Sequence, residues 1–277
     1  MLFIACGKGS EMPVFTEEDF SWLPTTRTCG CEGTRLNCLD RKETYQLGST
    51  VLNVQKRQVW KDSHPARFIP ELPEKYINLF SHRGETVLDP FCGSGTTNLV
   101  ADQLDRNSIG IDVNPYSTGL TIKRLKGEEE NGTRHQIVTG DTRKVMEIIP
   151  DESIHLIVTS PPYFDVVDYK HDDDDQLGNI HDYDEFLAGM EMAFEQMFRV
   201  LRQGGYAVVN TQDLFKKAAK CPIHSDYIQM MSGMGFEISN VNIYILNYST
   251  GGRLVFGYPR SYYPKNDHEY IVIVRKP

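Results

Sequence analysis

The stretch TVLDPFCGSGTT, residues 86–97, organises the rest of this chain. Its first three residues are β-branched or apolar and predict a short buried strand that ends at Asp89. Gly93 and Gly95 then predict a tight turn, after which a helical pattern begins. Glycines let the backbone approach a ligand closely, and the start of a helix offers unpaired N–H groups. The segment therefore predicts a ligand-binding turn between a strand and a helix.

A second motif, TSPPY at residues 159–163, closes another apolar strand pattern. Two consecutive prolines cannot continue a strand ladder or enter a helix interior, so they predict a stiff loop at the carboxyl end of that strand. The glycine turn of the first motif lacks the Gly-Lys-Ser/Thr ending of a Walker-type phosphate loop, which argues against such a loop here.

DPFCGSGTT and TSPPY together resemble the motifs of the S-adenosylmethionine-dependent amino-methyltransferases of DNA, which modify cytosine N4 or adenine N6. The resemblance runs from about His64 to the C-terminus. It implies S-adenosyl-L-methionine as the cofactor and DNA as a partner, and it raises a cognate restriction endonuclease as a second partner. It also implies the Rossmann-like methyltransferase fold, an α/β architecture with a seven-stranded, mostly parallel, doubly wound sheet and an antiparallel edge strand.

The strand and helix patterns agree with this fold class. The predicted strands are residues 86–88, 108–112, 136–140, 154–159, 206–210, 236–246 and 269–274. Their alternation with helical patterns implies a mostly parallel sheet with helices on both faces, and the last two strands can pair as a hairpin. Residues 1–50 have no sustained period and are interpreted as an N-terminal extension, which leaves residues 51–277 as the methyltransferase domain.

Acidic side chains are predicted at the ends of these strands. An acidic residue about 20 positions after a glycine turn is suited to ribose hydroxyls, which assigns this role to Asp112, with Asn114 beside it. By resemblance, Asp141 accepts a hydrogen bond from the adenine amino group, and capping of a helix that starts near Thr142 is the rival role. The resemblance also places an HPA-x-F segment over the methionine end of the cofactor. The predicted cofactor-binding residues are His64, Pro65, Phe68, Asp89, Pro90, Phe91, Gly93, Gly95, Thr96, Thr97, Asp112, Asn114, Asp141 and Thr142.

The TSPPY motif is predicted to carry the residues that assist methyl transfer. The lone pair of an exocyclic amine is delocalised into the base, so acceptors that draw the nitrogen toward tetrahedral geometry assist methyl transfer. Ser160 Oγ and the Pro161 carbonyl are the predicted acceptors, in a loop stiffened by Pro162. Tyr163, with Phe164 beside it, is predicted to stack on a base that leaves its duplex. The resemblance associates Ser at the first motif position with cytosine N4, while the absence of a Pro-Cys dipeptide argues against methylation of cytosine C5.

Charge limits where DNA could bind. The net charge of −9 argues against indiscriminate binding to a polyanion, because Lys and Arg supply most of the non-specific affinity for phosphates. Residues 246–266 mix cations with aromatic rings, a combination suited to phosphates and unstacked bases. The predicted DNA-binding residues are Phe164, Arg253, Tyr258, Arg260 and Lys265.

The cysteines have two interpretations. Cys29, Cys31 and Cys38, with Cys6, could make a small zinc site, but their spacing is not that of a standard ribbon or finger. Free thiols in an irregular segment are therefore expected, and no metal ligand is assigned. No apolar run approaches the roughly 20 residues of a membrane span, and the chain start lacks a basic signal-peptide region, so a cytoplasmic, DNA-associated protein is expected.

Three alternatives to a cytosine-N4 enzyme stay open at this point. The first is an adenine-N6 DNA methyltransferase, and the second is an RNA or protein methyltransferase of the same fold. The third is a cofactor-binding module without catalytic activity. Intact motifs in both halves of the chain argue against the third, and Ser160 in place of the Asn of Asn-Pro-Pro-Tyr enzymes argues against the second.

Overall fold

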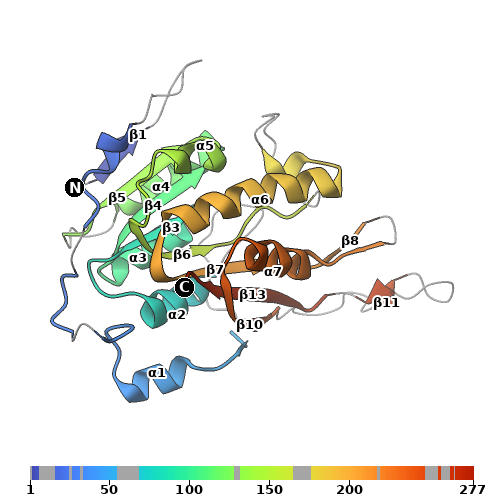
Figure 1. Ribbon diagram of the computed structural model, residues 1–277, viewed down its shortest axis with the longest axis horizontal. Helices are drawn as coiled ribbons and strands as arrows, with labels where there is room; N and C mark the ends of the chain where they lie inside the picture. The colour runs from blue at the N-terminus through green and yellow to red at the C-terminus, as the bar shows by residue number, and fades with distance from the viewer. Residues whose placement is uncertain are drawn as a thin grey trace.

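A nine-stranded sheet forms the centre of the molecule, with the strand order β1-β5-β4-β3-β6-β7-β13-β10-β2 (Figure 1). The computed structural model describes residues 2–5, 16–24, 27–31, 34–54, 69–127, 132–164, 176–216, 219–246, 255–256, 263–264 and 266–277. The strands are β1 (Leu2–Ala5), β2 (Val51–Leu52), β3 (Thr86–Asp89), β4 (Asn107–Asp112), β5 (His135–Thr139), β6 (Ile154–Thr159), β7 (Leu201–Thr211), β8 (Leu214–Lys216), β9 (Ala219–Cys221), β10 (Glu237–Ile245), β11 (Val255–Phe256), β12 (Tyr263–Pro264) and β13 (His268–Arg275).

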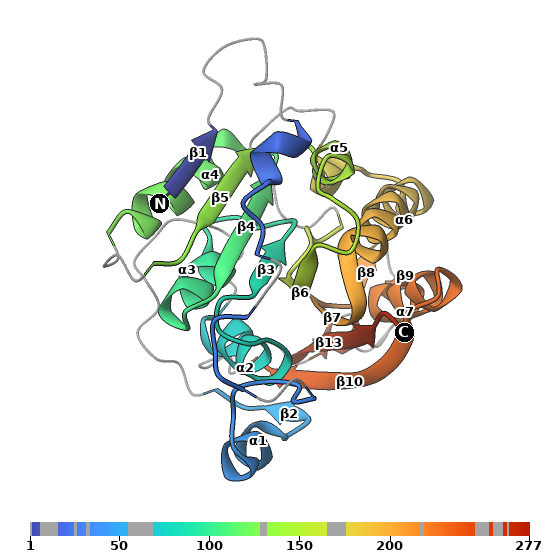
Figure 2. The same ribbon diagram turned by 60° about the vertical axis from the view of Figure 1, so that its left-hand side comes forward.

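Helices cover both faces of the sheet, as Figure 2 shows, with α2, α3 and α4 on one face and α5, α6 and α7 on the other. The helices are η1 (Glu17–Phe20), α1 (Arg41–Leu47), α2 (Glu71–Phe80), α3 (Thr96–Gln103), α4 (Pro115–Leu125), α5 (Thr142–Glu147), η2 (Leu177–Asn179), α6 (Tyr183–Val200) and α7 (Ile223–Gly233). Among the helices in the described part of the chain, none has the length and apolar character needed to cross a membrane.

The alternation of side chains along each strand builds apolar cores on both faces of the sheet. Val87 packs with α2 residues such as Tyr76, whereas its neighbour Leu88 packs with α6 residues such as Phe194. Successive side chains of a strand point to opposite faces, so a strand with apolar residues on both faces must be covered on both sides. All four residues of β3 are buried, as this arrangement requires.

The predicted fold class is confirmed, and the sheet is wider than predicted. All seven predicted strands are present, as β3, β4, β5, β6, β7, β10 and β13. The N-terminal residues add β1, which pairs with β5, and β2, which pairs with β10, at opposite edges of the sheet. The prediction of an antiparallel edge strand is wrong, because β13 pairs antiparallel with both β7 and β10 and therefore lies inside the sheet.

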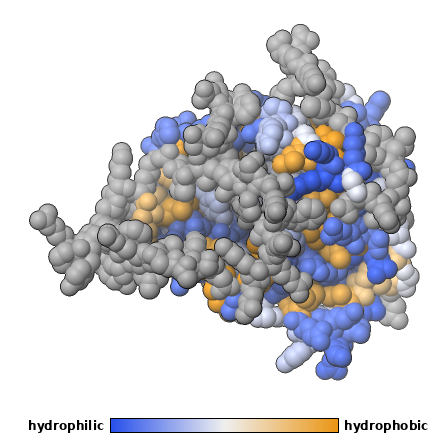
Figure 3. Space-filling view, turned by 180° about the vertical axis from the view of Figure 1, so that it is seen from behind, coloured by the Kyte–Doolittle hydropathy of each residue, from blue (hydrophilic) through white to orange (hydrophobic). Residues whose placement is uncertain are grey.

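Two small hairpins, β8-β9 and β11-β12, lie outside the main sheet. On the face seen in Figure 3, hydrophobic residues appear in several separate patches among hydrophilic ones. Exposed large hydrophobic residues are likewise dispersed over the described elements, for example Tyr45 on α1, Tyr116 on α4 and Met192 on α6. Scattered exposed apolar residues are normal for a protein surface and do not by themselves mark an interface.

Candidate cofactor and substrate site

Four predicted site residues lie at or just after the carboxyl ends of neighbouring strands. Asp112 ends β4 and Asp89 ends β3, while Asp141 follows β5 and Ser160 follows β6. Strands β5, β4, β3 and β6 are adjacent and parallel, so their carboxyl ends meet at the same edge. The chain order reverses at β3 and β6, and ligands of open α/β sheets bind in the crevice at such a switch point.

Asp89 joins the two sequence motifs at this switch point. Its Oδ1 accepts hydrogen bonds from Thr159 Oγ1 at 2.7 Å and from the Phe91 backbone N–H at 3.1 Å. The residue is 3 % exposed, and burial raises the pKa of its carboxyl to about 6. The Phe91 side chain packs against the core on the α6 face, so the DPF segment is anchored on the sheet.

The glycine turn is anchored on β4. Gly93 and Gly95 have positive φ angles of 51° and 81°. A Cβ at Gly95 would lie 2.3 Å from Thr121 Cγ2, so the close approach of α4 requires glycine there. The Gly93 N–H donates to Asp112 Oδ2 at 2.9 Å, and the Cys92 N–H donates to the Ile111 carbonyl at 2.8 Å. These two bonds hold the turn against the end of β4.

Asp112 also bonds the chain that follows β4. Its Oδ1 accepts the Asn114 N–H at 2.8 Å, and the residue is half-buried. Its place at the carboxyl end of β4, directly beside the glycine turn, is the place predicted for the residue that binds the ribose hydroxyls. Asn114 itself caps α4, since its Oδ1 accepts the Tyr116 N–H at 2.9 Å.

Asp141 caps a helix, which is the alternative to adenine binding that the sequence left open for it. Asp141 is the N-cap of α5, and its Oδ1 accepts the Arg143 N–H at 3.0 Å and Arg143 Nε at 2.9 Å. Beside it, the buried Thr142 Oγ1 has no hydrogen-bond partner among the described residues. An unpaired buried hydroxyl costs about 1–3 kcal/mol, so a polar ligand group here would relieve a deficit. The Thr142 hydroxyl thus fits the prediction of a ligand near this strand end.

The second motif contains a carboxylate contact that the sequence did not predict. Ser160, Pro162 and Tyr163 are half-buried, and Tyr163 Oη donates to Glu269 Oε1 at 3.0 Å. Asn210 Nδ2 donates to the other oxygen, Glu269 Oε2, at 2.6 Å. Burial raises the pKa of Glu269 above its usual range. Glu269 is the second residue of β13, just before the apolar run of that strand, and an acidic residue there is the signal that could have drawn attention to it.

Phe164 does not have the exposed position that base stacking requires. Its ring is 2 % exposed and packs against Tyr183 and Phe186, with ring-centroid distances of 5.1 and 5.3 Å. The side chain belongs to the core beneath the Ser-Pro-Pro-Tyr loop, so we do not retain it as a DNA-binding residue.

The remaining predicted residues divide into two groups. Pro90, Thr96 and Thr97 lie in the glycine motif, where Thr97 is buried and Thr96 begins α3. Seven residues lie outside the described part of the chain. These are His64, Pro65, Phe68, Arg253, Tyr258, Arg260 and Lys265.

The chain is similar to known DNA methylases. The family described as DNA methylase matches residues 24–122 and 154–277. The type II methyltransferase M.Cfr9I of Citrobacter freundii is 40% identical over 85 residues, which cover 31% of this chain and 28% of that protein. M2.DpnII of Streptococcus pneumoniae is 40% identical over 83 residues, which cover 30% of each protein. The matched region thus spans less than a third of these curated relatives.

A solved structure shows the fold alone. The crystal structure of a putative rRNA-methylase from Clostridium thermocellum has a TM-score of 0.50 and 16% identity, and the match covers 74% of this chain and 95% of that one. The family match, in contrast, includes both motifs and most of the chain. By that match, the chain belongs to the N6/N4 DNA methylase family.

Proposed function

We propose that the protein is an S-adenosylmethionine-dependent DNA methyltransferase that modifies an exocyclic amino group. The observation that carries this proposal is the hydrogen bond between Thr159 and Asp89, at 2.7 Å. It joins the end of β3, in the glycine motif, to the strand end that leads into Ser160. A cofactor held on one side of the switch point would therefore lie beside the loop that receives the base.

The proposed cofactor site uses the strand ends described above. Asp112 would accept the ribose hydroxyls, and Thr142 would pair with a polar group of the adenine, with Asp141 sharing its carboxylate between the cap and the ligand. Asp89 and the glycine turn would line the methionine side, together with His64 and Phe68. When bound, S-adenosylmethionine supplies the electrophilic methyl group.

The residues of the Ser-Pro-Pro-Tyr loop would orient the amine. Ser160 Oγ and the Pro161 carbonyl accept hydrogen bonds from the amino protons, and these bonds strengthen as the nitrogen becomes tetrahedral. Tyr163 provides a stacking face for the flipped base, and Glu269 fixes the direction of its hydroxyl. No general base is required, because the methylated amine is strongly acidic and loses its proton after transfer.

Within this class we favour cytosine N4 as the acceptor. The support is Ser160 at the first position of the motif, which the family resemblance associates with N4 chemistry. Adenine N6 is the alternative acceptor. A restriction endonuclease with the same DNA target is the partner we propose from the names of the type II relatives.

The test is transfer of labelled methyl groups to DNA, tRNA and protein, followed by mass spectrometry of the product nucleosides. We expect label in DNA as N4-methylcytosine. Ser160→Ala should lower the rate by about 10-fold to 100-fold, the cost of one aligned acceptor of about 1.4–2.7 kcal/mol. Ser153→Ala is the matched control, because Ser153 precedes the opposite end of β6 and bonds the Pro150 carbonyl. A ring-carbon methyl product, or full activity of Ser160→Ala, would contradict the mechanism.

A further inference from the structure

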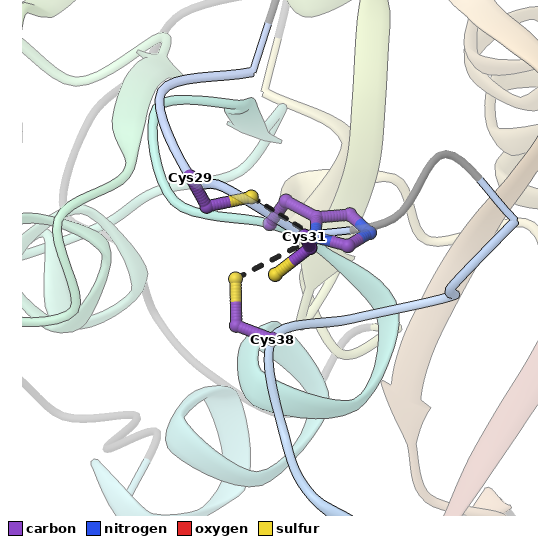
Figure 4. Close-up of side chains that lie close together, drawn as sticks. Cys29, Cys31 and Cys38 are labelled. Carbon is purple, nitrogen blue, oxygen red and sulfur yellow. Dashed lines mark hydrogen bonds between the residues drawn. The ribbon is translucent and has the colours of Figure 1, made fainter.

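Three cysteines and one histidine meet near the amino end of β3, away from the proposed cofactor site. Cys29, Cys31 and Cys38 lie in the N-terminal segment, and His82 lies in the turn between α2 and β3. The three Sγ atoms and one ring nitrogen of His82 all lie within 4.8 Å of one another. Figure 4 shows the cysteine sulfurs gathered at one point, with dashed lines for the contacts of Cys29 and Cys38 with His82.

The spacing of these atoms fits a tetrahedral centre. Cys29 Sγ lies 3.4 Å and Cys38 Sγ lies 3.5 Å from His82 Nδ1. Zinc–sulfur bonds of about 2.3 Å and zinc–nitrogen bonds of about 2.0 Å place sulfur and nitrogen about 3.6 Å apart in a tetrahedron. The single lone pair of Nδ1 serves one S–H donor well. Two sulfurs at nearly equal distances are better explained by an ion that all the ligands share.

A backbone carbonyl sets the histidine for this role. His82 Nε2 lies 2.9 Å from the Arg35 carbonyl oxygen, which can only accept, so Nε2 carries the proton. Nδ1 then presents its lone pair to the sulfurs. Metal-binding histidines usually donate their second ring N–H to such an acceptor, which fixes the tautomer and the ring orientation.

The scaffold around the cluster is buried and hydrogen-bonded. The His82 side chain is fully buried, and its backbone N–H donates to Glu85 Oε2 at 2.7 Å. On the cysteine side, the Thr28 N–H donates to the Arg83 carbonyl at 3.2 Å, and Asn37 Nδ2 donates to the Leu79 carbonyl at 2.8 Å. Hydrogen bonds thus join the cysteine-containing segment to the segment that carries His82, both before and after His82 in the sequence.

A neighbouring arginine adds an argument from charge. Arg106 is 2 % exposed, and its guanidinium donates to Ser81 Oγ at 3.1 Å and to the Ser81 carbonyl at 2.8 Å, both neutral groups next to His82. Buried charges are normally balanced by a nearby charge of opposite sign. Glu85 and Asp105 supply part of this balance. Three thiolates on one divalent ion carry a net negative charge, which would add to it.

We propose that Cys29, Cys31, Cys38 and His82 bind one zinc ion in a structural site. Soft thiolates with one imidazole in a tetrahedral arrangement select zinc among the common divalent ions. Four protein ligands leave no open position for substrate, so the ion ties the N-terminal segment to the turn that precedes β3. The site replaces the free thiols expected from the sequence, and His82 takes the place that Cys6 had in the zinc alternative.

Elemental analysis of the purified full-length protein tests the proposal. We expect about one zinc ion per chain in the wild type. In Cys38→Ser and in His82→Ala, the zinc content per chain should fall by at least about 10-fold, because each variant lacks one of the four ligands. His82→Cys should retain zinc, because a sulfur at this position reaches nearly the same point as Nδ1. Cys221→Ser is the matched control, since Cys221 lies in β9 outside the cluster, and it should keep its zinc. Absence of zinc from the wild type, or the same zinc content in Cys38→Ser, would overturn the assignment, as would its loss from Cys6→Ser.

A second measurement does not depend on whether the variants fold. Wild-type protein produced in cobalt-containing medium should show intense thiolate-to-cobalt charge transfer and the visible bands of tetrahedral Co²⁺. Weak bands of octahedral Co²⁺ without charge transfer would overturn the proposal. This outcome is independent of the methyltransferase assay, because neither spectrum depends on catalysis.

Discussion

The two ends of strand β3 show two different ways of using polar side chains. At the carboxyl end, the buried Asp89 and its half-buried neighbours Asp112 on β4 and Ser160 after β6 face the switch point where the sequence predicts the ligands. At the amino end, Cys29, Cys38 and His82 are turned toward one another and complete their own ligand set. A strand of four residues separates the two ends by about 10 Å. The carboxyl end is suited to ligands that bind reversibly, and the amino end to an ion that remains bound.

This comparison predicts separable effects of substitution. Changes at the carboxyl end should alter ligand binding and catalysis, while changes in the cysteine and histidine cluster should mainly alter stability. Asp89 is the residue that tests the boundary, because it belongs to the carboxyl end and is also fully buried.

The largest effect we expect is the pH dependence of stability that comes from Asp89. Its pKa is about 6 in the folded protein against 3.8 for the ordinary carboxyl. The protonated form therefore stabilises the fold below about pH 4, and this contribution is lost as the pH rises to about 6, a change of about 3 kcal/mol. Asp89→Asn cannot ionise, so its stability should decline less over the same range. Denaturant unfolding at a series of pH values measures the difference.

The matched control for this experiment is Asp184→Asn, an exposed carboxylate in the first turn of α6. Its profile should follow that of the wild type. Parallel profiles of Asp89→Asn and the wild type would show that the buried carboxyl does not resist ionisation.

An intermediate effect is expected for cofactor binding by Asp112. Asp112→Ala removes the acceptor of the Gly93 and Asn114 N–H groups and of the proposed ribose hydroxyls. Loss of such hydrogen bonds should weaken S-adenosylmethionine binding by about 1–3 kcal/mol in calorimetry. Cys38→Ser should instead affect stability: its melting temperature should fall, while the folded protein should bind the cofactor as tightly as the wild type does. If Asp112→Ala binds as well as the wild type, the proposed ribose contact is wrong.

The sequence predicted the features that depend on neighbouring residues. The strand and the glycine turn of residues 86–97 are local patterns, and the acid at Asp112 follows at a fixed spacing. The edge strands β1 and β2 were missed, because four and two residues show no period of their own. The interior position of β13 was also missed, since it depends on how β7 and β10 pair with it.

Residues brought together only by the tertiary structure could not be predicted in the same way. His82 is 44 residues from Cys38, and Glu269 is 106 residues from Tyr163. Neither pair has a spacing that marks it in the sequence. The capping role of Asp141 was foreseen as an alternative, but only the position of Arg143 in the structure shows that the carboxylate is already engaged.

The smallest effect we expect comes from the Tyr163 hydroxyl, and it tests how finely the carboxyl end is arranged. Tyr163→Phe keeps the ring and removes the hydrogen bond to Glu269 Oε1. Burial raises the pKa of Glu269, so its charge is weakened and the bond should contribute about as much as a typical hydrogen bond, about 1 kcal/mol net. The methyl-transfer rate should then fall by about 5-fold. Tyr163→Ala should lose the stacking face as well, at a further cost of about 1–3 kcal/mol.

A double-mutant cycle with Glu269→Gln separates orientation of the ring from a general loss of packing. If Glu269 acts on the base only through Tyr163, the double variant should be about as slow as the slower single variant. Tyr116→Phe, on the exposed surface of α4, is the matched control and should leave the rate unchanged. Additive losses in the cycle would mean that Glu269 acts on the site by another route, such as its bond with Asn210. The carboxyl end would then be arranged by two independent contacts, and not by a single chain of hydrogen bonds from β13 to the base.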